Sequence, residues 1–398
     1  MTALHNNVRS LGLSIVKLAG YRGIQRSVSA SSSRYLSTES QSEETAKEKR
    51  KTIFSGIQPT GIPHLGNYLG ALQNWVNLQN DADRNGDELF FSIVGLHALT
   101  VPNDPKKLFI ERREMMAALL AVGIDPNKVT LFHQDQVPEH TELAWILNCI
   151  TPFGKLNRMT TWKSKLATLR YRGSEQGIDE TGLCLGLFAY PVLQAADILL
   201  YRATHVPIGE DQVQHLELSR DLADLFNKTY KKRQFPLPQH IITPTKRVLS
   251  LRNPKQKMSK SSPDVNSRVL LTDSDDVIKG KIKRAITDTE PTISFDPKVR
   301  PGVSNLLSIL SALDTIRSPQ EWADELNQRA GAEGGAGRIL KEAVTDTVIS
   351  AIRPIREEYQ RLQKDPGHLL AMEQLGKEKA QERAAKIMHQ VRRLVGLT

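Results

Sequence analysis

Short apolar runs alternate with longer amphipathic stretches between residues 52 and 275. The runs Thr52–Ile57, Leu89–Val94, Val129–Phe132 and His205–Ile208 are apolar and rich in β-branched or aromatic residues, so each predicts a buried strand. Helices are predicted between them, because apolar residues return there at helical spacing. Strands that alternate with helices favour a parallel sheet. The sequence therefore predicts an α/β fold with a doubly wound, Rossmann-type parallel sheet.

The predicted helices are defined by their apolar faces. The clearest one follows the first strand and has apolar residues at i, i+3, i+4 and i+7 spacing, namely Leu65, Tyr68, Leu69, Leu72, Trp75 and Val76. Two further helices are predicted over Lys107–Val122 and from about Asp211 to Phe226. We expect the sheet and these helices to form one domain over residues 51–274.

The pattern changes after residue 275, where strand-like runs stop. Helices are predicted over Val303–Ile316, Ile339–Gln363 and Leu369–Leu397, with a glycine-rich break at Gly331–Gly337. Pro354 is expected to bend or divide the second of these helices, because proline lacks the backbone N–H. The sequence therefore predicts a C-terminal α-helical domain over residues 275–398.

Charge is distributed unevenly at the N-terminus. Residues 1–38 contain five cations, eight serines and no carboxylate; the cations are Arg9, Lys17, Arg22, Arg26 and Arg34. A segment that is rich in Arg and Ser and poor in acids is typical of an organellar transit peptide. The alternative is a basic tail that binds RNA. We expect residues 1–38 to be a mitochondrial transit peptide and residues 39–50 to be a polar linker.

Composition excludes several classes of protein. The chain has 398 residues, of which 39% are hydrophobic and 25% charged, so a largely disordered chain is not expected. It has two cysteines, Cys149 and Cys184, and no Cys-x-x-Cys pair, which excludes a disulfide scaffold and a zinc ribbon. The sequence contains no run of 18 apolar residues, so no membrane span is predicted and we expect no membrane partner. The net charge of +10 permits a nucleic-acid partner without requiring one.

The first candidate site is the stretch Ser55–Asn67, which joins the first strand to the first helix. In an open α/β sheet, ligands bind where strands end and helices begin. The free N–H groups of a helix N-terminus suit a phosphate, and Gly66 lets a flat base approach the backbone. His64 and Asn67 can donate hydrogen bonds to phosphate or ribose oxygens. The alternative is an ordinary strand–turn–helix connection.

The second candidate site is the loop Lys257–Ser261. Two lysines three residues apart, with small neighbours, can surround a polyphosphate and stabilise charge on a leaving pyrophosphate. The alternative is a solvated basic loop. Together, the two stretches predict a site for a nucleoside triphosphate.

These stretches resemble the two signatures of class I aminoacyl-tRNA synthetases, and more narrowly tryptophanyl-tRNA synthetases of the bacterial and mitochondrial type. The signatures stand at Pro63–Asn67 and Lys257–Ser261. Supporting stretches are Ile53–Gly61, Asn67–Leu72, Ala195–Tyr201, Gly209–Gln212 and Pro301–Leu307. The resemblance covers roughly residues 51–398.

The resemblance implies ATP-dependent ligation of L-tryptophan to mitochondrial tRNA(Trp), through a tryptophanyl-adenylate and with release of AMP and pyrophosphate. The substrate carboxylate, which is already ionised, attacks the α-phosphorus, so no protein nucleophile or general base is needed. Catalysis then depends on positioning and on charge stabilisation. This agrees with the lack of any Ser/His/Asp or Cys/His arrangement in the sequence.

The resemblance also assigns the ATP site and the groups that assist catalysis. The residues implied to bind ATP are Gln58, Pro59, Thr60, Gly66, Asn67, Gly209, Glu210, Asp211, Val248, Lys257, Met258, Ser259, Lys260 and Ser261. Lys257, Lys260, Asn67 and Lys163 are implied to be catalytic, although Lys163 is equally well explained as a solvated lysine. ATP is a substrate, and Mg²⁺ is expected to be held through its phosphates, with no protein metal site.

Tryptophan selection is expected to depend on Asp197. The indole of tryptophan has one polar group, an N–H that only donates, so a selective pocket needs one buried acceptor in apolar surroundings. Asp197 lies in an apolar stretch and matches the family position that contacts the indole. The alternative is an Asp that caps a helix or pairs within the core. By the same resemblance, Tyr190, Gln212, Phe54, Gly56 and His97 also line the tryptophan site.

The resemblance further implies the partners and the location. We expect a homodimer in the mitochondrial matrix, with tRNA bound across two subunits. Cations of the helical end would face the anticodon region, although a solvated helix face explains many of them equally well; they are Lys341, Arg353, Arg356, Arg361, Arg392 and Arg393.

Three other functions are compatible with parts of the sequence. A tyrosyl-tRNA synthetase shares the fold and both signatures, but the residues around Asp197 do not resemble its pocket. A different nucleotidyltransferase would lack the Lys257–Ser261 loop. An RNA-binding protein derived from a synthetase would have lost catalysis, which the presence of Asn67, Asp211, Lys257 and Lys260 argues against.

Overall fold

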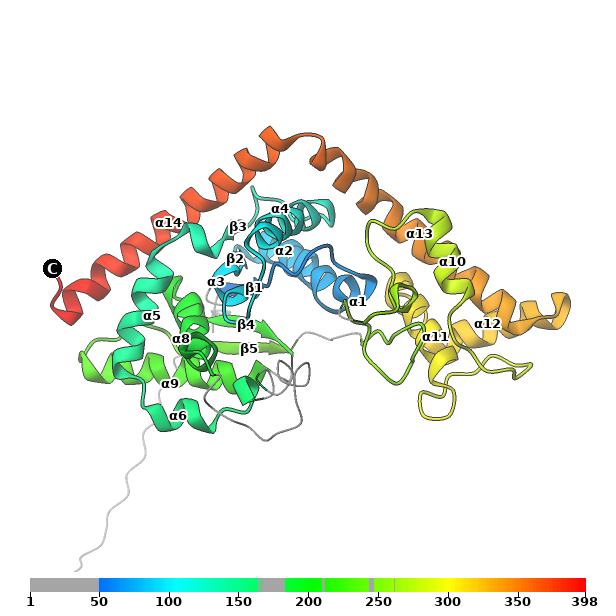
Figure 1. Ribbon diagram of the computed structural model, residues 1–398, viewed down its shortest axis with the longest axis horizontal. Coiled ribbons are helices and arrows are strands. Elements are labelled where there is room, and N and C mark those ends of the chain that lie inside the picture. Colours follow the sequence, from blue (N-terminus) through cyan, green and yellow to red (C-terminus); the bar gives the residue numbers. More distant parts are fainter. Residues whose placement is uncertain (1–49, 164–165, 167–182, 210–211, 243–246, 261) are drawn as a thin grey trace, which may run out of the picture. The chain divides into compact units, whose positions relative to one another are not determined.

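The structure, a computed structural model, describes residues 50–163, 166, 183–209, 212–242, 247–260 and 262–398. These residues belong to one compact unit, Lys49–Thr398. Within them, five parallel strands form a sheet in the order β3-β2-β1-β4-β5 (Figure 1). The strands are β1 Thr52–Ile57, β2 Glu88–Ile93, β3 Thr130–His133, β4 His205–Ile208 and β5 Gln239–Ile242. The doubly wound parallel sheet expected from the sequence is confirmed.

Helices cover both faces of this sheet. In chain order the described helices are α1 Leu65–Asn67, the π-helical turn η1 Tyr68–Leu72, α2 Gln73–Asn85, α3 Gly95–Ala98, α4 Pro105–Ala121, the 3-10 turn η2 Gln134–Gln136, α5 Glu139–Ile150, α6 Phe153–Arg158, α8 Leu185–Leu200 and α9 Val213–Thr229. They are followed by the 3-10 turn η5 Val265–Ser267, α10 Asp275–Lys283, α11 Pro301–Asp314, α12 Pro319–Glu333, α13 Ala336–Gln363 and α14 Pro366–Val395.

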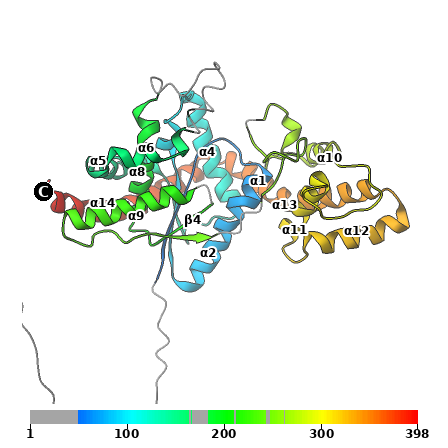
Figure 2. The same cartoon turned by 90° about the horizontal axis from the view of Figure 1, so that it is seen from below.

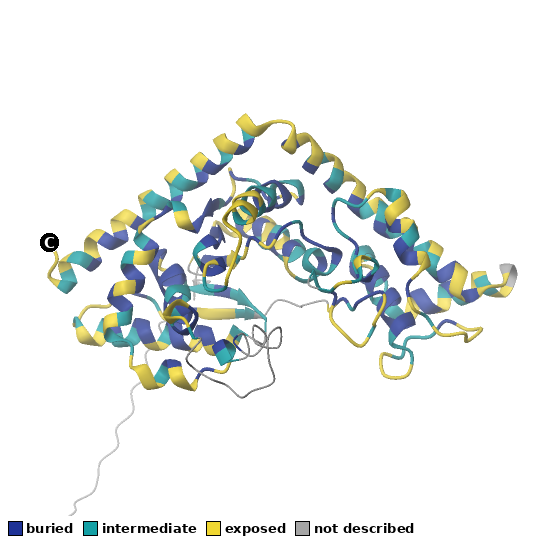
Figure 3. Cartoon of the chain, viewed as in Figure 1, coloured by how far each residue is buried: buried dark blue, intermediate teal, exposed yellow. Residues whose placement is uncertain are grey.

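Side-chain alternation along the strands divides the interior into two cores. Ile53 and Phe91 point into a core built with α1, α2, α4 and the helices α10 to α13. Their neighbours Phe54 and Phe90 point the other way, into a core built with α5, α8, α9 and α14. Successive residues of a strand face opposite sides, so continuous apolar strands need helices on both faces. Buried positions accordingly run through the strands and along one side of each surrounding helix (Figure 3).

The C-terminal end is helical, as predicted, and its last helix returns to the sheet. Helices α10 to α13 gather beside α1 (Figure 2), and α13 also packs on α4. Helix α14 packs against β3 and α5. A Cβ atom at Gly376 of α14 would collide with the backbone carbonyl of Leu131 in β3, so the close approach of this helix requires glycine.

Most predicted elements are confirmed, with a few differences. The strands starting at Thr52 and His205 have the expected bounds, whereas strand β5 and helices α3, α5, α6, α8, α10 and α12 were not predicted. Pro354 does not divide its helix: α13 runs without a break from Ala336 to Gln363. Ile352 and Ile355 on either side of the proline are buried in the core, and this burial offsets the lost hydrogen bond. The predicted transit peptide and residues 39–49 lie outside the described residues.

The topology fixes where a ligand is expected. The strand order reverses between β1 and β4, whose connections leave the sheet toward opposite faces. In open α/β sheets a crevice forms outside the carboxyl ends of such a pair of strands.

Candidate active site

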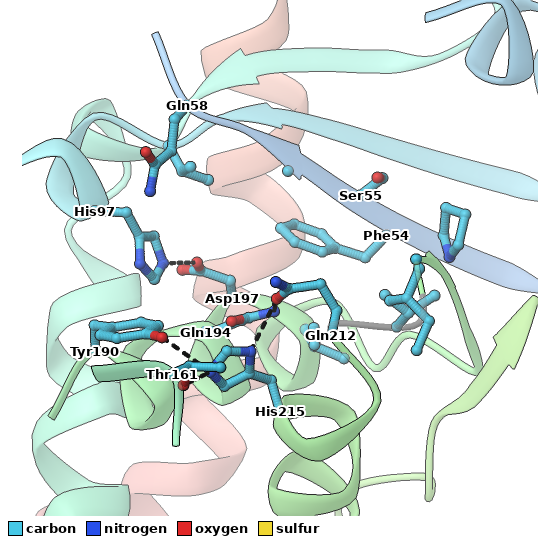
Figure 4. A pocket seen from close by; sticks show the side chains of 17 residues that line it. Phe54, Ser55, Gln58, His97, Thr161, Tyr190, Gln194, Asp197, Gln212 and His215 are labelled. Carbon is cyan, nitrogen blue, oxygen red and sulfur yellow. Dashed lines mark hydrogen bonds and ion pairs between the residues drawn. The ribbon is translucent and has the colours of Figure 1, made fainter. Parts of the chain in front are cut away.

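A cavity of about 550 Å³ lies at the carboxyl ends of β1 and β4 (Figure 4). Its size is that of a small-molecule site. It is lined by Phe54, Ser55, Gly56, Gln58, Val94, His97, Thr161, Tyr190, Gln194, Asp197, Ile198, Val206, Pro207, Ile208, Gly209, Gln212 and His215. All six residues predicted for tryptophan are among them. Strand β1, helices α3 and α8 and the start of α9 thus bring these dispersed residues into one wall.

Asp197 is the buried acceptor of this cavity. Only 1% of the residue is exposed, and it is carried by the apolar helix α8. Its Oδ2 lies 2.8 Å from His97 Nε2 and its Oδ1 lies 2.6 Å from His140 Nδ1. The amide of Gln134 donates to both carboxylate oxygens, at 2.7 and 2.8 Å. A buried carboxylate needs such partners, because an unpaired one is costly.

These contacts also set the charge of Asp197. Burial raises the pKa of its carboxyl group, but the hydrogen bonds from His140 and His97, with their charges, outweigh this effect and lower the pKa from 3.8 to about 2. The carboxylate is therefore ionised at neutral pH. His140 is itself held by Tyr201, whose hydroxyl lies 2.8 Å from His140 Nε2.

A second hydrogen-bonded group in the wall of the cavity centres on His215. His215 Nε2 lies 3.0 Å from the Tyr190 hydroxyl and 2.9 Å from Thr161 Oγ1. His215 Nδ1 lies 2.9 Å from Gln212 Oε1. Figure 4 shows Tyr190, Thr161 and Gln212 converging on this histidine. His215, at 1% exposure, therefore orients the two residues, Tyr190 and Gln212, that were predicted to face the amino acid.

Apolar contacts shape the rest of the cavity. Phe54 stacks on Tyr201 with 5.8 Å between ring centroids. Gly56 leaves room at the end of β1, since a Cβ atom there would stand 3.0 Å from Val94 Cγ1. A ring-shaped apolar ligand can therefore lie between β1 and α8.

The first signature begins a helix through reciprocal hydrogen bonds. The His64 side chain accepts from the Asn67 N–H, with Nδ1 at 3.2 Å, and Asn67 Oδ1 accepts from the His64 N–H at 3.1 Å. Both predicted residues Gly66 and Asn67 lie in this first turn. A Cβ atom at Gly66 would stand 3.1 Å from the His64 ring. The next turn, Tyr68–Leu72, is π-helical, a distortion that is common at functional sites.

The second signature is fixed to the helical end of the chain. Asn305 of α11 holds the Leu249 backbone from both sides, accepting from its N–H at 2.8 Å and donating to its carbonyl at 3.1 Å. The Val248 carbonyl accepts from the Met258 N–H at 3.0 Å. Val248 and Met258 are both buried, whereas Lys257 is exposed. The loop therefore has an anchored base and a polar tip.

Lys260 joins the second signature to the first candidate stretch, Ser55–Asn67. Its Nζ donates to the carbonyl oxygens of Gly61, at 2.6 Å, and Thr60, at 2.9 Å. Partial burial lowers the pKa of Lys260 from 10.5 to about 8, against the opposing charges of Glu111 and Glu114 on α4. Burial, with the charges of Lys260, Arg268 and Lys257, lowers the pKa of His64 from 6.5 to about 4. The two signatures therefore form a single electropositive site.

The remaining predicted residues are distributed as follows. Gln58 and Gly209 line the cavity, and the buried Pro59 connects Gln58 to Thr60. Ser259 lies within the loop beside Lys260. Lys163 does not join this group among the described contacts: its Nζ lies 5.3 Å from the centroid of the Trp162 ring. Glu210, Asp211 and Ser261 lie outside the described residues.

Sequence reasoning missed Gln134, His140 and His215. Gln134 and His140 contact Asp197 but come from other elements of the chain, so no local pattern links them to it. Glu111 and Glu114, which face Lys260, were also missed. No group of His, Cys, Asp and Glu that could hold a metal ion occurs among the described residues, and no helix among them is long and apolar enough to cross a membrane.

Comparison with known proteins gives the family. The profile of "tRNA synthetases class I (W and Y)" matches residues 46–352. The mitochondrial tryptophan–tRNA ligase of Schizosaccharomyces pombe is 44% identical over 353 residues, which cover 87% of this chain and 95% of that protein. The chain belongs to the class I tryptophanyl-tRNA synthetases. A bacterial tryptophan–tRNA ligase, from Rickettsia conorii, is 43% identical over 348 residues, which cover 87% of this chain and 99% of that protein.

A solved tryptophanyl-tRNA synthetase has the same fold. The enzyme from Campylobacter jejuni, complexed with ADP and tryptophan, superposes with a TM-score of 0.72 at 31% identity and covers 87% of this chain and 100% of that one. The family and fold expected from the sequence are thereby confirmed. Membership in this family also excludes the unrelated nucleotidyltransferase considered above.

Proposed function

We propose that this tryptophanyl-tRNA synthetase attaches L-tryptophan to mitochondrial tRNA(Trp), through a tryptophanyl-adenylate and with release of AMP and pyrophosphate. One observation carries the proposal: Lys260 of the second signature lies against Thr60 and Gly61, and the same loop begins at Gln58, which lines the Asp197 cavity. A phosphate site and a slot with a buried acceptor are thus contiguous.

The amino acid would lie in the Asp197 cavity. An indole N–H only donates, and the Asp197 carboxylate is a buried anion in the wall. A phenol hydroxyl both donates and accepts, so tyrosine would leave a polar group poorly matched beside the three groups that already contact Asp197. The Tyr190–His215–Gln212 group would receive the α-amino group.

The triphosphate of ATP would lie between the two signatures. The residues proposed to hold it are those of the first turn of α1, the Gln58–Thr60 loop, Gly209, Glu210, Asp211, Val248 and the Lys257–Ser261 loop. Lys260 and Lys257 would neutralise charge that develops on the leaving pyrophosphate. Asn67 would position the nucleotide, and the assignment of Lys163 as a third phosphate ligand requires its side chain to leave Trp162. Mg²⁺ would arrive with ATP and be held by the phosphates.

The tRNA is proposed to contact residues 275–398, while residues 51–274 carry out the chemistry. Several cations of the helical end are already paired. Arg353 and Arg356 bind Asp275, Arg361 binds Glu358, and Arg392 binds Glu142. Ion pairs reduce the charge available to phosphates, so tRNA contact at this end would depend on fewer cations than the sequence suggests.

A homodimer is proposed on an exposed apolar face beside the cavity. Leu99, Trp145 and Leu185 are 62%, 70% and 78% exposed. Leu99 and Trp145 line a shallow groove together with Tyr190, which also lines the Asp197 cavity. Large exposed apolar side chains in one patch are typical of an interface. A second copy would therefore bury the outer side of a residue that faces the substrate.

The dimer can be tested by substitution on this face. We expect Trp145→Asp to shift the sedimentation coefficient toward that of a monomer, whereas Phe109→Asp, at a residue that is 58% exposed on α4, should leave it unchanged. A wild-type protein that sediments as a monomer would contradict the proposed dimer.

The mitochondrial matrix is proposed from two observations. Residues 1–38 have the composition of a transit peptide, and relatives from Schizosaccharomyces pombe, Saccharomyces cerevisiae and Dictyostelium discoideum are named as mitochondrial. Fusion of residues 1–50 to a fluorescent protein should direct it to mitochondria, and a cytosolic fusion would contradict the assignment.

The reaction is tested by amino-acid-dependent exchange of pyrophosphate into ATP. We expect exchange with tryptophan and less than about a thousandth of that rate with tyrosine, because the pocket leaves the phenol hydroxyl poorly paired. Tyrosine-dependent exchange would identify a tyrosyl enzyme, and no exchange with any amino acid would favour an RNA-binding derivative.

A further inference from the structure

A second cavity, of about 590 Å³, lies at the opposite ends of the same strands. Thr52 is the first residue of β1, and Thr204 directly precedes β4. Both line this cavity, so it opens at the amino ends of the strands that end at the candidate active site. It is lined by Arg50, Thr52, Arg202, Thr204, Arg233, Pro236, Arg383, Lys386, Ile387 and Gln390.

The lining of this cavity is strongly cationic. Its five cations come from four separate segments of the chain: the start of β1, the α8–β4 turn, the α9–β5 connection and helix α14. Arg202 and Arg233 are exposed and have no ion-pair partner among the described residues. Lys386 pairs with Glu382, and Arg383 makes one long contact to Glu88, at 3.5 Å. Cations brought together by tertiary structure repel one another unless an anion joins them.

Hydrogen-bonding capacity in the wall is also incompletely used. The Nε of Arg383 is buried and has no hydrogen-bond partner among the described residues. Buried donors without a partner are rare in native proteins, and each calls for an explanation. The Thr52 and Thr204 hydroxyls are already engaged, with Glu88 Oε2 at 3.4 Å and the Thr52 carbonyl at 3.2 Å, and Gln390 Oε1 accepts from Gln234 at 3.0 Å. The wall therefore offers a ligand chiefly guanidinium groups, which only donate.

We propose that this cavity binds a small anion that carries two or more phosphate groups, such as a nucleoside polyphosphate or an inorganic polyphosphate. Arginine guanidinium groups match phosphate oxygens in paired hydrogen bonds. A cavity of 590 Å³ has the size of a small-molecule site, whereas an RNA backbone is more often bound along an open basic surface. The short apolar part of the wall, Pro236 and Ile387, suits the non-phosphate part of such a ligand.

The backbone conformation of Arg202 makes it a suitable residue for a test substitution. Arg202 has a φ of 54°, in the left-handed region that favours glycine, directly after the cap of helix α8. Arg202→Gly therefore removes a cation of the cavity without straining the fold. Lys231 is the matched control, because it is an exposed cation with a φ of 50° directly after the cap of helix α9 and does not line the cavity.

The measurement is calorimetric titration of the full chain with inorganic tripolyphosphate. Both substitutions are made in a Lys260→Ala background, which weakens binding at the candidate active site. We expect Arg202→Gly to weaken the binding about tenfold, as for the loss of one charge-assisted hydrogen bond, and Lys231→Gly to leave it unchanged. The melting temperature of both variants should be no lower than that of the parent, which would show that the fold is intact.

Two results would overturn the proposal. The first is equal tripolyphosphate affinity in the Arg202→Gly and Lys231→Gly variants. The second is that a twelve-nucleotide uridine oligomer binds more tightly than tripolyphosphate and that Arg202→Gly weakens the binding of this oligomer. The cavity would then be an RNA site. All of these experiments measure binding and none measures aminoacylation. A negative result would therefore not count against the proposed ligase reaction.

Discussion

The ammonium group of Lys260 lies 2.6 Å from the carbonyl oxygen of Gly61, although 199 residues separate them in sequence. In this arrangement, backbone carbonyls of the loop before the first signature hold a cation of the second signature in place. Phosphate oxygens are stronger acceptors than neutral carbonyls, so a bound triphosphate would take over these hydrogen bonds. Lys260 is therefore positioned close to where charge on the pyrophosphate would develop.

Lys260→Ala should slow adenylate formation much more than it weakens tryptophan binding. Loss of one preorganised donor to developing charge commonly costs about 10²- to 10³-fold in rate. Pyrophosphate exchange gives the rate, and tryptophan titration gives the affinity. The control is Lys231→Ala, at an exposed lysine in the turn after α9. Equal losses of rate and tryptophan affinity would show that Lys260 acts only through the fold.

The activity should fall with rising pH through the titration of Lys260. Its pKa is lowered to about 8, chiefly by burial, so the free enzyme loses this positive charge as the pH rises above about 8. The kcat/KM for ATP, which reports the free enzyme, should decrease above that pH. Lys260→Arg should keep a flat profile up to about pH 9.5, because a guanidinium stays protonated. A decrease that persists in Lys260→Arg would assign the titration to another group.

Asp197→Asn should impair tryptophan recognition. The substitution replaces one carboxylate oxygen by an NH₂ group, which then faces donors from Gln134, His97 or His140. Hydrogen bonds to charged groups contribute about 1.5–3 kcal/mol, so the KM for tryptophan should rise at least tenfold. Asp83→Asn, at an exposed carboxylate paired with Lys128, is the control. An unchanged KM for tryptophan would remove Asp197 from the indole contact.

Asp197 should also contribute to stability in a pH-dependent way. Its folded-state pKa of about 2 lies below the ordinary value of 3.8, because the bonds from His140 and His97 outweigh the effect of burial. The contribution is therefore present above about pH 4 and is lost as the pH falls toward 2; a shift of this size corresponds to about 2 kcal/mol. Urea unfolding of wild type and Asp197→Asn should show a difference that shrinks over this range. A constant difference would contradict the assignment.

Gly376→Ala should destabilise the attachment of α14 to the sheet. A methyl group there collides with the backbone carbonyl of Leu131, which cannot rotate away as a side chain can. Overpacking of this kind costs about 1–3 kcal/mol, and more where the backbone must move. Gly367→Ala is the matched control in the same helix, since its new Cβ would stand 3.6 Å from Asp365 Oδ1, an ordinary contact. Thermal unfolding compares the two, and equal melting temperatures would refute the constraint.

Local patterns were sufficient for most of the fold. Apolar runs located β1 and β4 at their observed bounds, because a parallel strand buried on both faces leaves a continuous apolar run. They did not locate β5, whose four residues include Gln239 and His240 and which lies at the edge of the sheet. Nor did they show that α13 continues through Pro354, because that depends on how its apolar face is buried.

Only those residues of the candidate site that lie in a sequence motif could be predicted. The two signatures and the stretch around Asp197 are sufficient, as sequence alone, to indicate a nucleotide site and a tryptophan slot. His140, Gln134 and His215 were not identified, since each stands among other polar residues of its element and lies in no recognised motif. Their burial at 1% or less gives them their role, and burial is a property of the packed chain.

The sequence by itself determined the family, the alternation of strands and helices, and the chemistry that the two signatures can perform, because these follow from residue type and short-range spacing. The tertiary structure alone decided which groups surround Asp197, how Lys260 reaches Gly61, and that arginines from distant segments share one cavity. Such arrangements arise when the parallel sheet brings strand ends together, and no local pattern records which side chains will meet there.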